Sequence, residues 1–186
     1  THRCVITLAA DHLQRCPRSS SQLSSLTRFH LHTMNGASHR DLAQRLVEQY
    51  DLRGKNVLEI GCGKGEFITL LSVLGNNRGI GFDPGYREDR NLSEAAENVE
   101  FIQDFYSEKY AHYQADFVCC KMTLEHIQDT DSFLGTVRRS VGDRQDTILF
   151  FQIPEVTRIL EDCAFEDIYY EHCSYFSAGS LARLFR

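Results

Sequence analysis

Three absences narrow the class of protein that this 186-residue sequence encodes. No apolar run approaches the roughly 18 residues of a membrane-spanning helix, and the apolar stretch at residues 4–10 is too short for a secretory signal with its flanks. A basic surplus, typical of proteins that bind nucleic acid non-specifically, is also missing, because the formal net charge is −6. We therefore expect no membrane partner and no nucleic-acid partner.

The cysteines lack the regular pairing that a disulfide framework requires. Their number, seven, is odd, and their spacing is irregular. This pattern favours free thiols and a reducing, cytoplasmic location.

From about residue 37 the sequence alternates between helical and strand patterns. Short apolar runs predict strands at residues 56–60, 79–82, 99–102, 116–120 and 147–153, and helical patterns occupy residues 38–50, 66–74, 91–97, 131–140 and 177–186. Such interleaving is typical of an α/β, doubly wound, Rossmann-like fold with a mainly parallel sheet. Residues 1–36, which include the linker-like stretch PRSSSQLSS, are expected to precede this domain, which spans residues 37–186.

Three alternating glycines follow the first predicted strand, within the segment Glu59–Gly65 (EIGCGKG). Glycine lets a backbone turn tightly and approach a ligand closely. A dinucleotide-binding loop would carry glycine at position 66, but this sequence has Glu66. A carboxylate is unfavourable beside a pyrophosphate and favourable near a cationic sulfonium. The loop therefore favours a sulfonium cofactor over NAD, and a purely structural turn is the alternative.

Acidic residues follow the next two predicted strands. Asp83 lies 22 residues after Gly61, where a carboxylate can accept hydrogen bonds from both ribose hydroxyls. Asp104 is placed to accept a hydrogen bond from an adenine amino group, with Phe105 packing on the ring. The alternatives are an ordinary Asp-Pro-Gly turn at Asp83 and a solvated loop carboxylate at Asp104.

Two later segments are rich in proton-transfer groups. The pair Glu125-His126 follows the fourth predicted strand and fits a catalytic role and a packing role equally well. A metal site there is disfavoured, because no further ligands are spaced around the pair. His172 follows the fifth predicted strand, and histidine suits a general base near neutral pH. The alternative is that His172 holds its loop through a backbone hydrogen bond.

Four segments resemble class I S-adenosylmethionine-dependent methyltransferases: VLEIGCGKGEF, GFDP, FIQDFYSEKY and CCKMTLEHI. The segment DIYYEHCSYFSAGSLARLF is further similar to the nucleotide-sugar C-methyltransferase-like group, which methylates a carbon next to a keto group of nucleotide-activated deoxysugars. The resemblance covers roughly residues 40–186 and implies S-adenosylmethionine as the cofactor. It assigns cofactor contacts to Glu59, Gly61, Gly63, Asp83 and Asp104. We add Cys62, Gly65 and Phe105 to the expected cofactor site, together with Lys121, which leaves the fourth predicted strand where the methionine half of the cofactor is expected.

The same resemblance implies an active site at Tyr169, Glu171 and His172. His172 would remove a proton next to the carbonyl group of a small molecule, such as a nucleotide sugar, with help from the other two residues. Three alternatives stay open: O- or N-methylation of another small molecule, an inactive cofactor-binding domain, and an NAD-dependent oxidoreductase, which Glu66 disfavours.

The sequence departs from this group at both ends. The group's N-terminal zinc module has paired Cys-x-x-Cys motifs, whereas Cys4 and Cys16 are isolated, so no metal site is expected. The group also continues beyond the position of Arg186. We therefore expect a C-terminally incomplete domain, truncated before its last two strands, with a five-stranded sheet and an exposed edge.

Overall fold

The computed structural model describes residues 3–10, 32–35, 39–90 and 98–185, with the backbone alone for the first two stretches. The strands are β1 (Arg3–Ala10), β2 (His32–Asn35), β3 (Asn56–Ile60), β4 (Arg78–Phe82), β5 (Val99–Ile102), β6 (Phe117–Lys121) and β7 (Ile148–Pro154). The α-helices are α1 (His39–Gln49), α2 (Glu66–Gly75), α3 (Thr130–Val141), α4 (Val156–Glu161) and α5 (Ala178–Leu184). No helix of these described stretches is long and apolar enough to cross a membrane.

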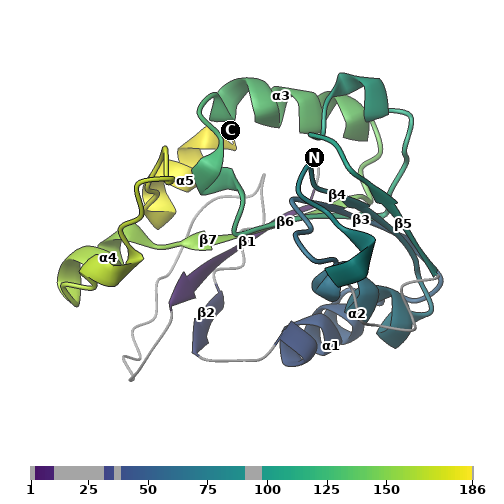
Figure 1. Cartoon of the computed structure of the whole chain (residues 1–186), viewed down its shortest axis with the longest axis horizontal. Coiled ribbons are helices and arrows are strands. Elements are labelled where there is room, and N and C mark those ends of the chain that lie inside the picture. The colour runs from purple at the N-terminus through teal and green to yellow at the C-terminus, as the bar shows by residue number, and fades with distance from the viewer. Residues whose placement is uncertain (1–2, 11–31, 36–38, 91–97, 186) are drawn as a thin grey trace.

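The strands form one parallel sheet in the order β2-β1-β7-β6-β3-β4-β5 (Figure 1). This arrangement confirms the predicted α/β, doubly wound, Rossmann-like fold. All five predicted strands are present, as β3 to β7, and four of the predicted helices are present, as α1, α2, α3 and α5. The predicted helix at residues 91–97 lies outside the described residues, and α4 was not predicted.

The prediction of a five-stranded sheet is wrong, because the sheet has seven strands. The two additional strands come from residues 1–36, and β1 pairs in parallel with β7 from Arg3↔Ile148 to Ala9↔Pro154. Every residue of β7 is buried, and an unpaired edge there would expose a row of peptide groups. The apolar residues 4–10, which are too short for a secretory signal, are suitable for a strand at that edge. The stretch PRSSSQLSS lies outside the described residues.

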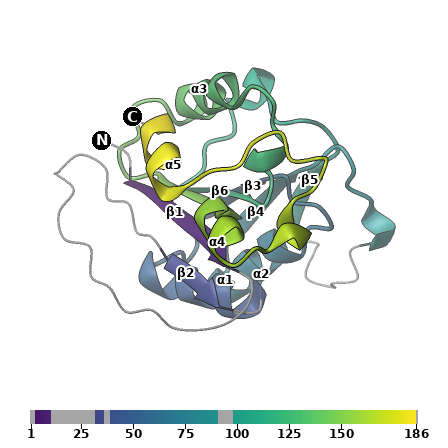
Figure 2. The ribbon, with the colours of Figure 1, turned by 90° about the vertical axis from the view of Figure 1, so that its left-hand side faces the viewer.

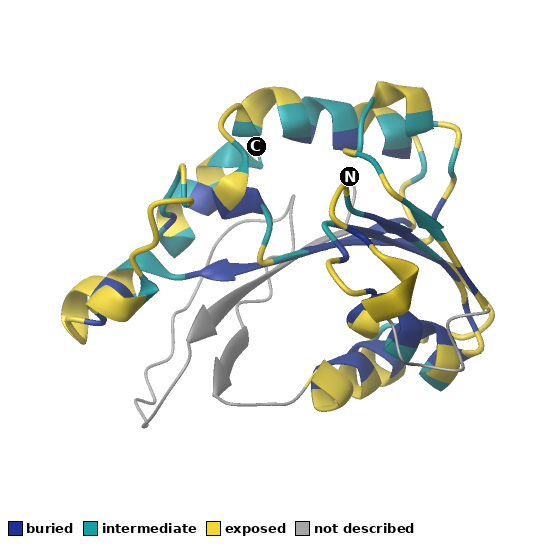
Figure 3. Ribbon diagram, viewed as in Figure 1, coloured by how far each residue is buried: buried dark blue, intermediate teal, exposed yellow. Residues whose placement is uncertain are grey.

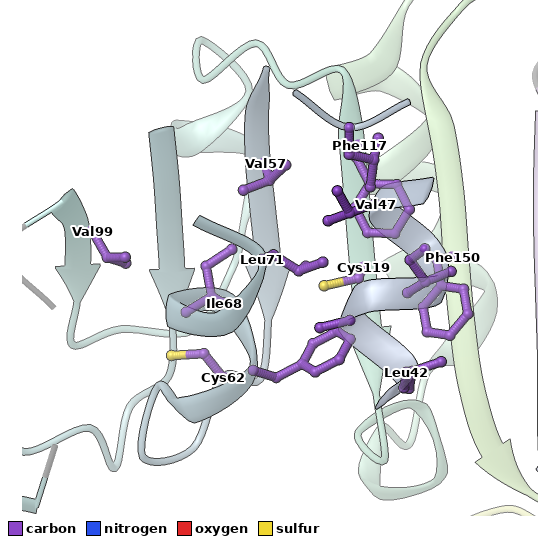
Figure 4. Packing of buried hydrophobic residues seen from close by; sticks show 14 of the residues in the cluster. Leu42, Val47, Val57, Cys62, Ile68, Leu71, Val99, Phe117, Cys119 and Phe150 are labelled. Carbon is purple, nitrogen blue, oxygen red and sulfur yellow. The ribbon is translucent and has the colours of Figure 1, made fainter. Parts of the chain in front are cut away.

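Alternate residues of each central strand pack into two separate hydrophobic cores. Val57 and Phe150 belong to the core under α1 and α2, whereas Leu58 and Phe151 belong to the core under α3 and α5 (Figures 1 and 3). Figure 4 shows the first of these cores, with side chains of both helices lying against the strands. Burial on both faces explains why these strands are continuous apolar runs in the sequence.

The carboxyl ends of the parallel strands meet at one edge of the sheet, which is where ligands bind in this type of fold. The chain that joins α4 to α5 runs across this side of the molecule (Figure 2). Two of its backbone N–H groups, those of Cys173 and Ser174, donate hydrogen bonds to the carbonyl oxygen of Glu125, at 2.7 and 3.2 Å. Glu125 lies in the short 3₁₀ helix η4 (Leu124–His126), directly after β6. The fold therefore brings two predicted functional segments together.

Candidate active site

The glycine loop between β3 and α2 has the backbone conformation that only glycine adopts readily. Gly61, Gly63 and Gly65 have φ angles of 74°, 56° and 80°. A Cβ atom at Gly61 would lie 2.1 Å from Oγ1 of Thr123, so the backbone there is in close contact with the chain after β6. A Cβ atom at Gly63 would have no described atom within 4 Å. The loop is thus packed at its first glycine and open at its second, as a ligand cradle requires.

Cys62 anchors the glycine loop to the hydrophobic core. It is only 7% exposed and belongs to the core under α1 and α2, and its burial raises the pKa of the thiol. A Cβ atom at Gly81 of β4 would lie 2.9 Å from its sulfur atom. The position of Cys62 is therefore that of a packing residue beneath the loop, and its predicted cofactor contact remains a prediction.

Glu59 provides a buried carboxyl group beside the glycine loop. Its side chain is 1% exposed, and Oε2 has no hydrogen-bond partner among the described residues. Burial raises the pKa of this carboxyl to about 7, although the nearby Lys121 and the N–H of Ile68 favour the ionised form. A cationic ligand group would supply the missing partner. The site therefore fits the positively charged end of S-adenosylmethionine.

The raised pKa of Glu59 leads to a testable pH dependence. In the ligand-free protein its stabilising contribution is fully present below about pH 4.5 and is lost as the pH rises to about 7, because the folded state binds the proton more tightly. We expect the free energy of unfolding of Glu59→Gln, relative to the parent, to rise by about 3 kcal/mol between pH 4.5 and pH 8. Urea denaturation at both values measures it, with exposed Glu161→Gln as the control. If the difference in free energy of unfolding between Glu59→Gln and the parent were the same at both pH values, the expected proton uptake by Glu59 on folding would be contradicted.

Asp83 connects the end of β4 to the glycine loop. Its Oδ2 accepts a hydrogen bond of 2.9 Å from the N–H of Gly63, and its Oδ1 accepts one of 2.8 Å from the N–H of Gly85. The structure thus brings the predicted ribose-binding carboxylate to the open glycine of the loop. The ribose contact itself remains a prediction.

Asp104 lies at the end of β5 and already has several partners. Its carboxylate accepts hydrogen bonds from the ammonium group of Lys109, from the hydroxyl of Tyr110 at 2.7 Å and from the N–H of Phe105 at 2.8 Å. The Lys109 and Tyr110 bonds are the main reason why the pKa of this carboxyl falls to about 2. The ring of Phe105 is 73% exposed and has room for a stacking partner. Both adenine contacts remain predictions, and Asp104 can make its contact only beside these existing bonds.

Two residues near the loop were missed by sequence reasoning. His39, the first residue of α1, has Nε2 3.4 Å from Nζ of Lys121 and Nδ1 3.7 Å from Oε2 of Glu66. Thr123 has Oγ1 3.0 Å from the carbonyl oxygen of Lys121 and 3.5 Å from that of Gly61. Its position after β6 was a signal that could have identified it. His39 had no such signal, because it precedes the loop by a whole helix.

The predicted proton-transfer segment forms an aromatic cluster around His172. The centre of its ring lies 4.8 Å from that of His126, 5.2 Å from that of Tyr169 and 5.4 Å from that of Tyr175. Tyr175 also holds the segment in place, because its hydroxyl accepts a hydrogen bond from the N–H of Tyr169 at 3.0 Å. The structure therefore brings Tyr169 and His172 together, as predicted, and adds His126 and Tyr175.

Glu171 takes part in this cluster mainly through its backbone. Its carbonyl oxygen lies 3.2 Å from Nδ1 of His126, whereas its side chain is exposed and raises the pKa of the Tyr170 hydroxyl. Burial and the neighbouring His126 lower the pKa of His172, and the charge of Glu171 partly offsets this effect. The predicted assistance of Glu171 to His172 remains a prediction.

The chain matches a family described as a methyltransferase domain over residues 31–186. This chain belongs to that family. Among curated proteins, the C-methyltransferase NovU of Streptomyces niveus is 31% identical over 155 residues, which cover 78% of this chain and 35% of NovU. The methyltransferase domain spans about a third of the length of the curated relatives it matches.

Solved structures agree with the fold of this methyltransferase domain. The plantazolicin methyltransferase BpumL, crystallised with S-adenosylhomocysteine, has a TM-score of 0.57 at 15% identity over 78% of this chain and 61% of its own. A protein described as a sarcosine dimethylglycine methyltransferase of Galdieria sulphuraria has a TM-score of 0.56 at 13% identity over 78% of this chain and 58% of its own. The methyltransferase domain is of class I, whose cofactor is S-adenosylmethionine.

Proposed function

We propose that this methyltransferase domain transfers a methyl group from S-adenosylmethionine to a carbon next to a keto group of a nucleotide-activated sugar. The main support for the proposal is the position of the residues that follow β6. Among them, Thr123 touches the glycine loop, and three residues later His126 packs against His172. The cofactor loop and a histidine suited to proton abstraction thus meet at one strand end. The likeness to NovU, named a C-methyltransferase, supports the same chemistry.

Each part of the site has a task in this proposal. Gly63 would leave room for the cofactor, Glu59 would offer a carboxyl group to its positive charge, and Asp83 would accept hydrogen bonds from its ribose. Asp104 and Phe105 would hold its adenine, and Lys121 would donate a hydrogen bond to its carboxylate. When bound, S-adenosylmethionine supplies an electrophilic methyl group, and its sulfur leaves as a neutral thioether.

The proton-transfer cluster prepares the substrate carbon for attack. An unprotonated ring nitrogen of His172 would accept the proton next to the carbonyl group, and the C–H electron pair would form an enolate, the carbon nucleophile to which the cofactor would supply its methyl group. The rings of Tyr169 and Tyr175 lie beside the imidazole ring. Burial lowers the pKa of His172, which keeps the imidazole neutral and able to accept a proton near neutral pH.

A deuterium-exchange experiment tests the carbon chemistry without methyl transfer. The protein is incubated in D₂O with S-adenosylhomocysteine and a nucleotide-activated keto-deoxysugar, and the mass of the sugar is followed. We expect the sugar to gain one deuterium next to the carbonyl group with the parent and none above background with His172→Ala. The exposed His112→Ala is the matched control and should exchange as the parent does. No exchange above background with the parent would contradict the proposal, and methyl transfer to an oxygen or nitrogen atom in a separate assay with S-adenosylmethionine would favour O- or N-methylation.

We also propose a cytoplasmic location. The odd cysteine count of the sequence supports it, and the five cysteines whose side chains the structure describes are all free thiols.

A further inference from the structure

Three groups able to bind a metal ion converge beside the proton-transfer cluster. A carboxylate oxygen of Glu125 and one ring nitrogen each of His126 and His172 all lie within 4.8 Å of one another. The sequence argued against a metal because no further ligand is spaced around Glu125 and His126. The third ligand comes from the distant segment that is hydrogen-bonded to η4 through Cys173.

Glu125 is the member of this trio whose burial requires an explanation. Its side chain is 2% exposed, yet neither carboxylate oxygen has a hydrogen-bond partner within the described stretches. Nδ1 of His172 is likewise buried without a partner among those residues. Buried carboxylates are normally paired, hydrogen-bonded or bound to a metal ion. His126 is exposed, so an ion can reach the trio from solvent.

We propose that Glu125, His126 and His172 form a binding site for a divalent transition-metal ion, with zinc as the ion of best fit. Two imidazole nitrogens and one carboxylate oxygen make up a common donor set of open zinc sites, whereas magnesium and calcium prefer oxygen ligands alone. Ligands about 2.0–2.2 Å from a tetrahedral zinc ion lie roughly 3.3–3.6 Å from one another. Two ligand atoms at the full separation of 4.8 Å must therefore move closer by roughly 1.2–1.5 Å to bind it.

Metal binding and proton abstraction exclude each other at His172. A neutral imidazole that coordinates a metal through one nitrogen carries its proton on the other, so no lone pair remains for a substrate proton. Zinc is therefore an inhibitor of the proposed reaction. This consequence depends on the proposed function, whereas metal binding itself does not.

Titration of the metal-free protein with Co²⁺, followed by visible absorption, and with Zn²⁺, followed by calorimetry, tests the site. We expect one ion per chain and a loss of affinity of at least tenfold in His126→Ala, His172→Ala and Glu125→Gln, since even the outer partners of metal ligands change affinity about 10–100-fold. His112→Ala is the matched control, because its ring is exposed and its Nδ1 lies 2.9 Å from the carbonyl oxygen of Lys109. Circular dichroism checks whether Glu125→Gln folds. If it does not fold, His126→Ala provides the test, because His126 is exposed.

Two results would overturn the site: parental affinity in His126→Ala or His172→Ala, or a thiolate-to-cobalt absorption band that disappears in Cys173→Ser. Inhibition by zinc is measured in a separate experiment. Zinc should stop deuterium exchange into the keto sugar, and a chelator should restore it. Exchange that continues with the site saturated by zinc would overturn the exclusion. Failure of the proposed function is seen separately, as a lack of exchange in the parent with chelator present.

Discussion

His172→Ala is expected to lower kcat for methyl transfer by about 10²–10⁴-fold, while the affinity for S-adenosylhomocysteine stays nearly unchanged. The reason is positional. His172 lies on the segment that follows β7 and α4, whereas the expected cofactor contacts lie at or after the ends of β3, β4, β5 and β6. A base that acts in the transition state affects the rate more than ground-state binding. Steady-state kinetics under saturating cofactor and calorimetric titration with S-adenosylhomocysteine measure the two effects.

The variant His126→Ala is the essential comparison, because its ring is the neighbour of His172. If His172→Ala kept the parental kcat and His126→Ala lost it, the base would be His126. Glu171→Gln should lower kcat in the same direction but by less, since its side chain is exposed and acts on His172 through its charge. All three measurements need a chelator, so that metal binding does not contribute to them.

Gly63→Val is expected to weaken binding of S-adenosylhomocysteine more than about 100-fold, which corresponds to about 3 kcal/mol, while the fold is retained. A Cβ atom at this position meets no described atom within 4 Å, so the substitution begins in open space rather than against the protein itself. A branched side chain would instead fill the open space in which the cofactor is expected to lie. Calorimetric titration measures the affinity, and thermal unfolding measures the stability.

Gly54→Val is the matched control for Gly63→Val. Gly54 has a similar φ angle, 63° against 56°, and a Cβ atom there also meets no described atom within 4 Å. It precedes β3, at the opposite end of that strand from the glycine loop. Both variants carry the same strain of about 1–2 kcal/mol from a left-handed backbone, but only Gly63→Val should lose the cofactor. Parental affinity in Gly63→Val would show that the loop is a structural turn.

Local patterns were sufficient to predict the central strands β3 to β7 and most of the helices. Val57 and Leu58, or Phe150 and Phe151, face different cores but are all apolar, because both faces of this sheet are covered. The glycine loop was also predictable from local geometry. Positive φ angles at Gly61, Gly63 and Gly65 require this residue type wherever the rest of the chain lies.

The edge of the sheet was not predictable in this way. The apolar residues 4–10 fit a strand, but their partner, β7, lies more than a hundred residues away along the chain. The segment between β1 and β2 resembles a linker, and linker composition says nothing about what its two ends pair with. Pairing at an edge depends on which peptide groups remain free after the central strands have assembled.

The sequence by itself determined the α/β class, the glycine loop and the acidic residues at the strand ends, because each depends on local backbone geometry and periodicity. Only the tertiary structure decided that Thr123 packs on Gly61, and that Glu125, His126 and His172 meet. The physical reason is that two loops from separate strand ends are joined by hydrogen bonds such as the one from Cys173 to Glu125. The spacing of these residues along the sequence does not indicate that they are in contact.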